Sequence, residues 1–157
     1  MNELLAGLGA VLTRLEPALV ELRRDIHAHP ELAHHEHRTT ALVTERLAAV
    51  GYHIHPLPDT GLVADLGPHE PTYRIALRAD LDALPVADQT GLPWASKVDG
   101  VCHACGHDLH VAAVLGAGLA FAEFADELRR RDMAIRLVFQ PAEEMIPGGA
   151  IDVVELG

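Results

Sequence analysis

The segment MAIRLVFQ at residues 133–140 gives the clearest strand signal in the chain. It is short and mostly apolar, and only Arg136 interrupts it with a charge, a pattern typical of a buried strand. We expect this strand to lie near the centre of a sheet. Pro141 follows it directly, and the acidic pair Glu143 and Glu144 comes next.

Strand-type and helix-type patterns alternate along the rest of the chain. Further strands are predicted over residues 52–56, 62–66 and 73–78, where short apolar runs are bounded by turn residues. Helices are predicted over residues 3–14, from Pro17 to before His29, and over 37–50, 110–128 and 148–156. Residues 87–100 are rich in glycine and proline and are predicted to form a loop. This alternation predicts an α/β layered fold.

Polar residues follow two of the predicted strands. Asp80 and Asp82 come after the strand at 73–78, and Glu143 and Glu144 come after the strand at 133–140. The segment around Cys105 stands just before a predicted helix. Because sites in α/β sheets form beyond the carboxyl ends of the strands, we expect these three segments to converge on one crevice.

The segment HACGHDLH at residues 103–110 holds a thiol, three imidazoles and a carboxylate. Thiolate and imidazole are ligands for borderline-soft divalent metals, so Cys105 and His107 are candidate ligands. Asp108 could fix the orientation of a ligating ring. The ordinary alternative is a buried cysteine beside a surface histidine, but the clustering favours metal binding. No second Cys/His pair at zinc-finger spacing follows, which argues against a structural zinc site.

The other candidate residues also have ordinary explanations. Glu143 and Glu144 could cap a helix N-terminus, or one could bind a metal while the other acts as a general base. Asp80 and Asp82 could orient a ligand, or could form simple turns. Three N-terminal histidines lack fixed spacing and are predicted to be solvated: His34, His35 and His37.

Composition excludes several classes of partner. The formal net charge of −11 disfavours nucleic acid and anionic membrane surfaces. No apolar run reaches the roughly 18 residues of a membrane span, and no secretory signal is recognised. The two cysteines do not form a disulfide framework. We therefore expect a cytoplasmic protein whose 157 residues form one domain.

Four motifs, taken together, resemble a known family. They are RRDIHAHPEL at 23–32, ALRADLDALP at 76–85, GVCHACGHD at 100–108 and FQPAEE at 139–144. In this order and at these separations they resemble amidohydrolases of the hippurate hydrolase and indole-acetyl-amino-acid hydrolase type, within the aminoacylase/carboxypeptidase-like metallopeptidases. One departure is Cys102, where the family usually has methionine.

The resemblance implies a three-layer α/β/α catalytic domain with a binuclear metal site. It implies hydrolysis of the amide bond of N-acyl amino acids or related small conjugates by a metal-activated water. By position, Cys105, His107 and Glu144 correspond to metal ligands and Glu143 to the general base. Asp82 corresponds to an aspartate that orients the catalytic centre. Asp80 and Asp108 would support the ligands, and the metal would be manganese or zinc, with cobalt and nickel as alternatives.

The chain is much shorter than members of this family. Residues 1–157 correspond to the N-terminal part of the catalytic domain, without the lid and dimerisation domain or the C-terminal half. No histidine follows His110, so two expected histidine ligands are missing. We expect little or no activity from this chain alone, and an exposed sheet edge that leads to self-association or to pairing with a complementing C-terminal half. The alternatives are one half of a split enzyme, a non-enzymatic metal-binding or interaction fragment, and a fold with a vestigial site.

Overall fold

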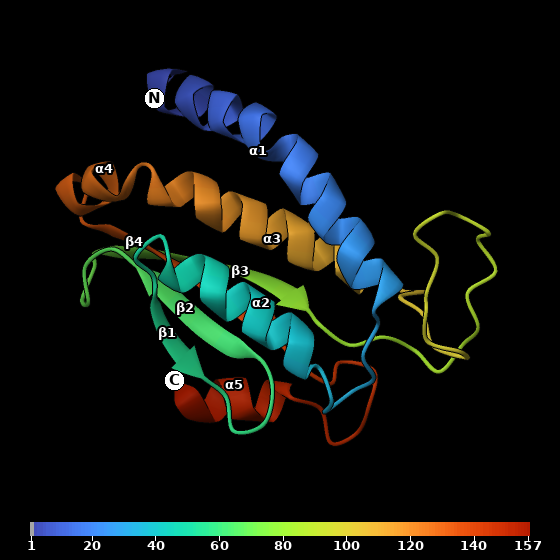
Figure 1. Ribbon diagram of the computed structural model, residues 1–157. Coiled ribbons are helices and arrows are strands. Elements are labelled where there is room, and N and C mark those ends of the chain that lie inside the picture. Colours follow the sequence, from blue (N-terminus) through green and yellow to red (C-terminus); the bar gives the residue numbers. More distant parts are fainter. Residues whose placement is uncertain (1) are drawn as a thin grey trace.

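The computed structural model describes residues 2–157 and shows five helices and four strands (Figure 1). The helices are α1 (Asn2–Ala28), α2 (His37–Ala48), α3 (His107–Ala122), α4 (Ala125–Arg130) and α5 (Ala150–Leu156). The strands are β1 (His53–Pro56), β2 (Leu62–Leu66), β3 (Tyr73–Asp80) and β4 (Met133–Gln140). Residues 87–100 form a loop, as predicted. No helix within residues 2–157 combines the length and apolar character needed to cross a membrane.

The four strands form one mixed sheet in the order β1-β2-β4-β3. β4 lies inside the sheet, as its sequence predicts, and pairs antiparallel with β2 and parallel with β3. In the parallel pair Asp80 lies opposite Gln140. The carboxyl ends of β3 and β4 therefore meet at the same end of the sheet.

Helices cover both faces of the sheet. Figure 1 shows α1, α2 and α3 on one side and α5 on the other. Ile135, Leu137 and Phe139 of β4 point to the first side and join one buried core with Leu115 of α3. Arg136 alternates with them and points to the second face, where it donates a hydrogen bond to the carbonyl of Gly157. This is the predicted three-layer order, although one short helix makes up the second helical layer.

The two helices predicted around Pro17 are a single helix, α1, with Pro17 inside it. A proline inside a helix removes one backbone hydrogen bond and crowds the preceding turn. Packing along α3 compensates, because Leu22 and Ile26 are buried in the core and Leu19 packs closely against Gly116. A Cβ at Gly116 would lie only 2.6 Å from Cδ1 of Leu19. Tertiary packing thus overrides the local preference for a break.

The helix predicted over residues 110–128 is also different. It begins three residues earlier, at His107, and a turn at residues 123–124 separates it from α4. The turn allows Leu128 of α4 to reach the core. The early start places His107 in the first turn of α3, directly after Gly106 with its positive φ of 79°.

β3 is an edge strand of the sheet formed by the described residues. Tyr73 and Ile75 lie on its core-facing side, since Ile75 is opposite Ile135, yet they are 67% and 46% exposed. The predicted exposed apolar edge is therefore present.

Candidate metal centre

Three segments distant in sequence meet at the carboxyl ends of β3 and β4. Asp80 ends β3, and Asp82 follows it. His107 begins α3, and the loop after β4 carries Glu143 and Glu144. These are the three segments that the sequence predicts to converge.

His107 is the central side chain of this cluster. Its Nδ1 donates to the backbone carbonyl of Asp82 at 2.8 Å and lies 3.4 Å from Oδ1 of the same residue. A ring that donates from Nδ1 leaves Nε2 as the atom available to a metal. That atom lies 3.9 Å from Oε2 of Glu143. The Asp82 side chain is the main cause that raises the pKa of His107 to about 9.

Asp82 connects His107 to the loop that carries the glutamate pair. It is buried, and its Oδ2 accepts a hydrogen bond from the backbone N–H of Glu144 at 2.9 Å. Burial alone would raise the pKa of Asp82, but His107 and the backbone amides of Glu144 and Glu143 outweigh it and hold the pKa below its usual value. Oδ1 is buried and accepts no hydrogen bond from any described residue.

Cys105 lies on the exposed side of the cluster, beside Glu144. A hydrogen bond to the Glu144 carboxylate is the main cause that raises the pKa of the Cys105 thiol to about 11. Burial and the negative charges of Glu144, Glu143 and Asp82 act in the same direction. Anionic groups thus crowd the thiol, and a nearby cation would reverse this effect and favour the thiolate.

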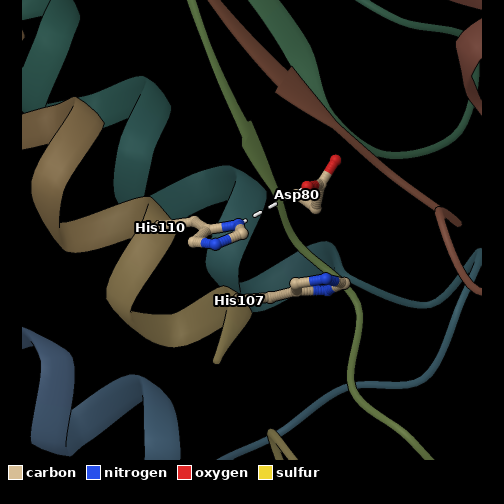
Figure 2. Close-up of side chains that lie close together, drawn as sticks. All are labelled: Asp80, His107 and His110. Carbon is tan, nitrogen blue, oxygen red and sulfur yellow. Dashed lines mark ion pairs between the residues drawn. The ribbon is translucent and has the colours of Figure 1, made fainter. Parts of the chain in front are cut away.

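Two overlapping groups of side chains could hold a metal ion. One is Asp80, His107 and His110, and the other is His107, Glu143 and Glu144; within each group the possible ligand atoms lie within 4.8 Å of one another. Figure 2 shows the first group, with the His110 ring directed toward Asp80. Imidazole and carboxylate suit a divalent transition metal. Cys105, which the sequence predicts as a ligand, lies beside Glu144 but belongs to neither group. The crowding of acidic groups around Cys105 and His107 also fits a bound cation.

His110 is the residue of these two groups to which the sequence analysis assigns no role. Its Nδ1 lies 3.5 Å from Oδ2 of Asp80, and Arg78 holds the other oxygen of Asp80 at 2.7–2.8 Å. His107 and His110 share a helix face because they are three residues apart. This spacing would have indicated His110, had α3 been predicted to begin at His107.

Asp108, which the sequence suggests as a support for the ligands, forms no hydrogen bond or ion pair with His107 in the described part of the chain. Its Oδ2 instead forms an ion pair with Nε of Arg23 at 2.7 Å and lies 2.8 Å from Nδ1 of His27. The other ring nitrogen of His27 is 3.2 Å from Asp88. This buried network fastens α1 and the loop at residues 87–100 to the start of α3. Arg23 and His27 belong to the first of the four motifs, which carries no predicted site residue.

A second buried acid positions the loop after β4. Glu36 is fully buried, accepts from the backbone N–H of Ala142 at 2.8 Å and accepts from the Thr60 hydroxyl at 2.6 Å. Ala142 has a φ of 49°, which is unfavourable for a residue with a Cβ. Glu36 and Asp82 therefore hold the backbone on either side of Glu143. The sequence analysis does not identify Glu36.

His103 is buried, with no hydrogen-bond partner for either ring nitrogen among the described residues. Burial is the main cause that lowers its pKa to about 4, so the ring is neutral at pH 7. It is not among the groups of possible metal ligands.

Comparisons with known proteins agree with this geometry. Residues 76–157 match peptidase family M20/M25/M40. A Bacillus subtilis N-acetyl-L-cysteine deacetylase is 47% identical over 147 residues, which cover 93% of this chain and 34% of that protein. A Rhodococcus jostii protein named putative glutamate–cysteine ligase 2-3 is 52% identical over 143 residues, which cover 90% of this chain and 17% of that protein.

A solved structure shares both fold and sequence. The dinuclear metal-binding peptidase of the M20 family from Bacillus subtilis superposes with a TM-score of 0.79 at 43% identity, covering 94% of this chain and 40% of that one. The chain thus spans between about a sixth and two fifths of the length of these relatives. The family match covers more than half of the chain and includes Asp80, His107 and both glutamates. The chain belongs to peptidase family M20/M25/M40.

Proposed function

We propose that this chain forms part of the metal centre of an amidohydrolase that cleaves the amide bond of N-acyl amino acids or related conjugates. The observation that carries the proposal is the convergence of His107, Glu143 and Glu144, with Cys105 beside them, around the buried Asp82. The names of the deacetylase and of the dinuclear peptidase support the same chemistry.

The ligands proposed for a divalent metal, manganese or zinc, are Cys105, His107 and Glu144. His110 and Asp80 offer a second group that shares His107. A metal bound at such a site lowers the pKa of a coordinated water and polarises the scissile carbonyl. Asp82 holds the His107 ring with Nε2 directed to the cluster and fixes the Glu144 backbone, so its role is to position two ligands.

Glu143 is the proposed general base. Its side chain is 39% exposed, and its Oε2 lies 3.9 Å from Nε2 of His107, so the carboxylate is next to the ligands and open to substrate. Oε2 would take a proton from the attacking water and deliver it to the nitrogen of the leaving amine. The restrained backbone at Ala142 keeps this carboxylate in place.

We further propose that activity requires polypeptide equivalent to the remaining length of the relatives. This chain spans about a third of the deacetylase, and His110 is its last histidine. The exposed apolar residues on β3 offer a strand edge on which a complementing segment, or a second copy of the chain, could continue the sheet.

The test is an assay of N-acetyl amino acid hydrolysis with added manganese or zinc, by this chain alone and with a candidate complementing segment. Glu143→Gln should retain metal but lose at least about a hundredfold in turnover, as expected for a general base. Glu155→Gln, at an exposed position on α5, is the matched control and should leave turnover unchanged. Full turnover in Glu143→Gln would overturn the proposed role, and turnover without metal would overturn the proposed chemistry.

A further inference from the structure

A second cluster of possible metal ligands lies on β1, at the edge of the sheet opposite β3. His53 and His55 alternate with Ile54, which packs against the core, so both rings project from the other face of the sheet. Asp65 of β2 is the register partner of His53 and lies on the same face. All three side chains belong to two adjacent antiparallel strands, which fixes their relative positions.

The nitrogen and oxygen atoms of this cluster are close together. Nδ1 of His53 is 3.1 Å from Nε2 of His55, and the ring centroids are 4.4 Å apart. The same Nε2 is 3.2 Å from Oδ2 of Asp65. A tetrahedral ion with metal–nitrogen bonds of about 2.0–2.1 Å separates its ligand nitrogens by about 3.3 Å. The separation of the two nitrogens is therefore within a few tenths of an ångström of the one that an ion needs, and a turn of the rings would direct both lone pairs at one ion.

We propose that His53 and His55, with Asp65 beside them, bind a divalent transition-metal ion of the class that prefers imidazole, such as zinc. This site is separate from the centre at the carboxyl ends of β3 and β4. Arg136 donates to both oxygens of Asp65 at 2.8–2.9 Å, so the carboxylate is held in place and partly neutralised. The two imidazoles are thus the principal ligands, and water completes the coordination shell.

The position of the site suggests a structural consequence. β1 is only four residues long and pairs only with β2 among the described strands. Because both principal ligands, His53 and His55, lie on β1, a bound ion would hold this edge strand in its extended conformation. Because the ion binds only the folded arrangement, it should stabilise the fold against heat.

Isothermal titration with zinc tests the proposal in a variant that carries Cys105→Ser and His107→Asn, which removes the first centre. This variant should still bind one zinc ion, and zinc should raise its Tm. Adding His53→Asn or His55→Asn should weaken the binding by at least about tenfold and abolish the rise in Tm.

A second histidine pair provides the matched control. His35 and His37 are exposed and, like His53 and His55, two residues apart, but their ring centroids are 6.4 Å apart. Replacing both with asparagine should leave zinc binding unchanged. In the chain with its first centre intact, His53→Asn should lower the zinc content by one equivalent.

Two results would overturn the proposal. The first has two parts: the Cys105→Ser, His107→Asn variant binds no zinc, and His53→Asn does not lower the zinc content of the chain with its first centre intact. The contact between His53 and His55 would then be only a hydrogen bond between the two rings. The second is that replacing His35 and His37 with asparagine weakens zinc binding as much as His53→Asn or His55→Asn does.

Discussion

The carboxylate of Asp82 accepts a hydrogen bond from the backbone N–H of Glu144 at 2.9 Å, across 62 residues of sequence. The backbone carbonyl of Asp82 accepts from Nδ1 of His107. One buried residue therefore orients two proposed metal ligands from different segments. Its position just after β3 makes this possible, because the parallel pairing with β4 brings the following loops together.

Asp82→Asn should weaken divalent-metal binding by about 10- to 100-fold, the effect typical of losing a group that orients metal ligands. The amide is nearly isosteric, so the fold should be retained. Calorimetric titration with manganese or zinc measures the change, and circular dichroism checks the fold. Asp99→Asn, at an exposed loop position, is the control. Equal metal affinity in Asp82→Asn and the unmodified chain would contradict the positioning role.

Cys105→Ala should abolish tight binding of a metal at this centre, because the thiolate is the strongest ligand proposed for it. Elemental analysis of the purified protein measures the loss. Cys102→Ala tests the other cysteine, which is buried, whereas Cys105 is exposed beside Glu144; this variant should retain the metal. Every variant should also carry His53→Asn, so that metal bound by the β1 cluster does not contribute to the measured metal content. One equivalent of tightly bound metal in Cys105→Ala would show that Cys105 is not required.

Local sequence predicts the central strand and the convergence of the acidic segments well. The apolar run of β4 and the polar residues directly after it require no knowledge of distant contacts. The continuity of α1 through Pro17 could not be predicted in this way, because it depends on Leu19 packing against Gly116 of α3. The partners of Asp108 are equally hidden, since Arg23 and His27 are more than 80 residues away in sequence.

The predicted start of the helix at residue 110 explains why the sequence does not indicate His110 as part of the candidate site. With the helix placed at residue 110, His107 and His110 do not fall on one helical face. Gly106, with its positive φ, allows the helix to begin directly at His107. Such a start carries no side-chain capping bond and so has no sequence signature of the usual kind.

The ion pair between Asp65 and Arg136 should make stability depend on pH. Burial would raise the pKa of Asp65, but hydrogen bonding and charge attraction from Arg136 outweigh it and hold the pKa below the usual 3.8. The stabilisation is therefore fully present above pH 3.8 and is lost as the pH falls through the lowered pKa. Asp65→Asn should lower the free energy of unfolding by about 1–2 kcal/mol at pH 7. It should also weaken the dependence of that free energy on pH below 3.8.

Urea unfolding between pH 2 and 7 measures the effect of Asp65→Asn. Asp126→Asn is the matched control, because Asp126 also pairs with an arginine but is 85% exposed. It should change stability by less than about 0.5 kcal/mol, as is usual for exposed pairs. If the free energy of unfolding of Asp65→Asn still falls with acid as in the unmodified chain, another carboxylate determines this pH dependence.

Ile75→Lys should reduce association of the chain with itself. Ile75 lies on the core-facing side of the edge strand β3 and is 46% exposed, so a charge there costs little burial but opposes pairing along the open edge. The sedimentation coefficient at increasing protein concentration measures association, and Tm measures the stability of the fold. Val154→Lys is the control, because Val154 is 79% exposed on α5, away from that edge. If both variants associate to the same extent as the unmodified chain, the β3 edge is not the surface that drives association.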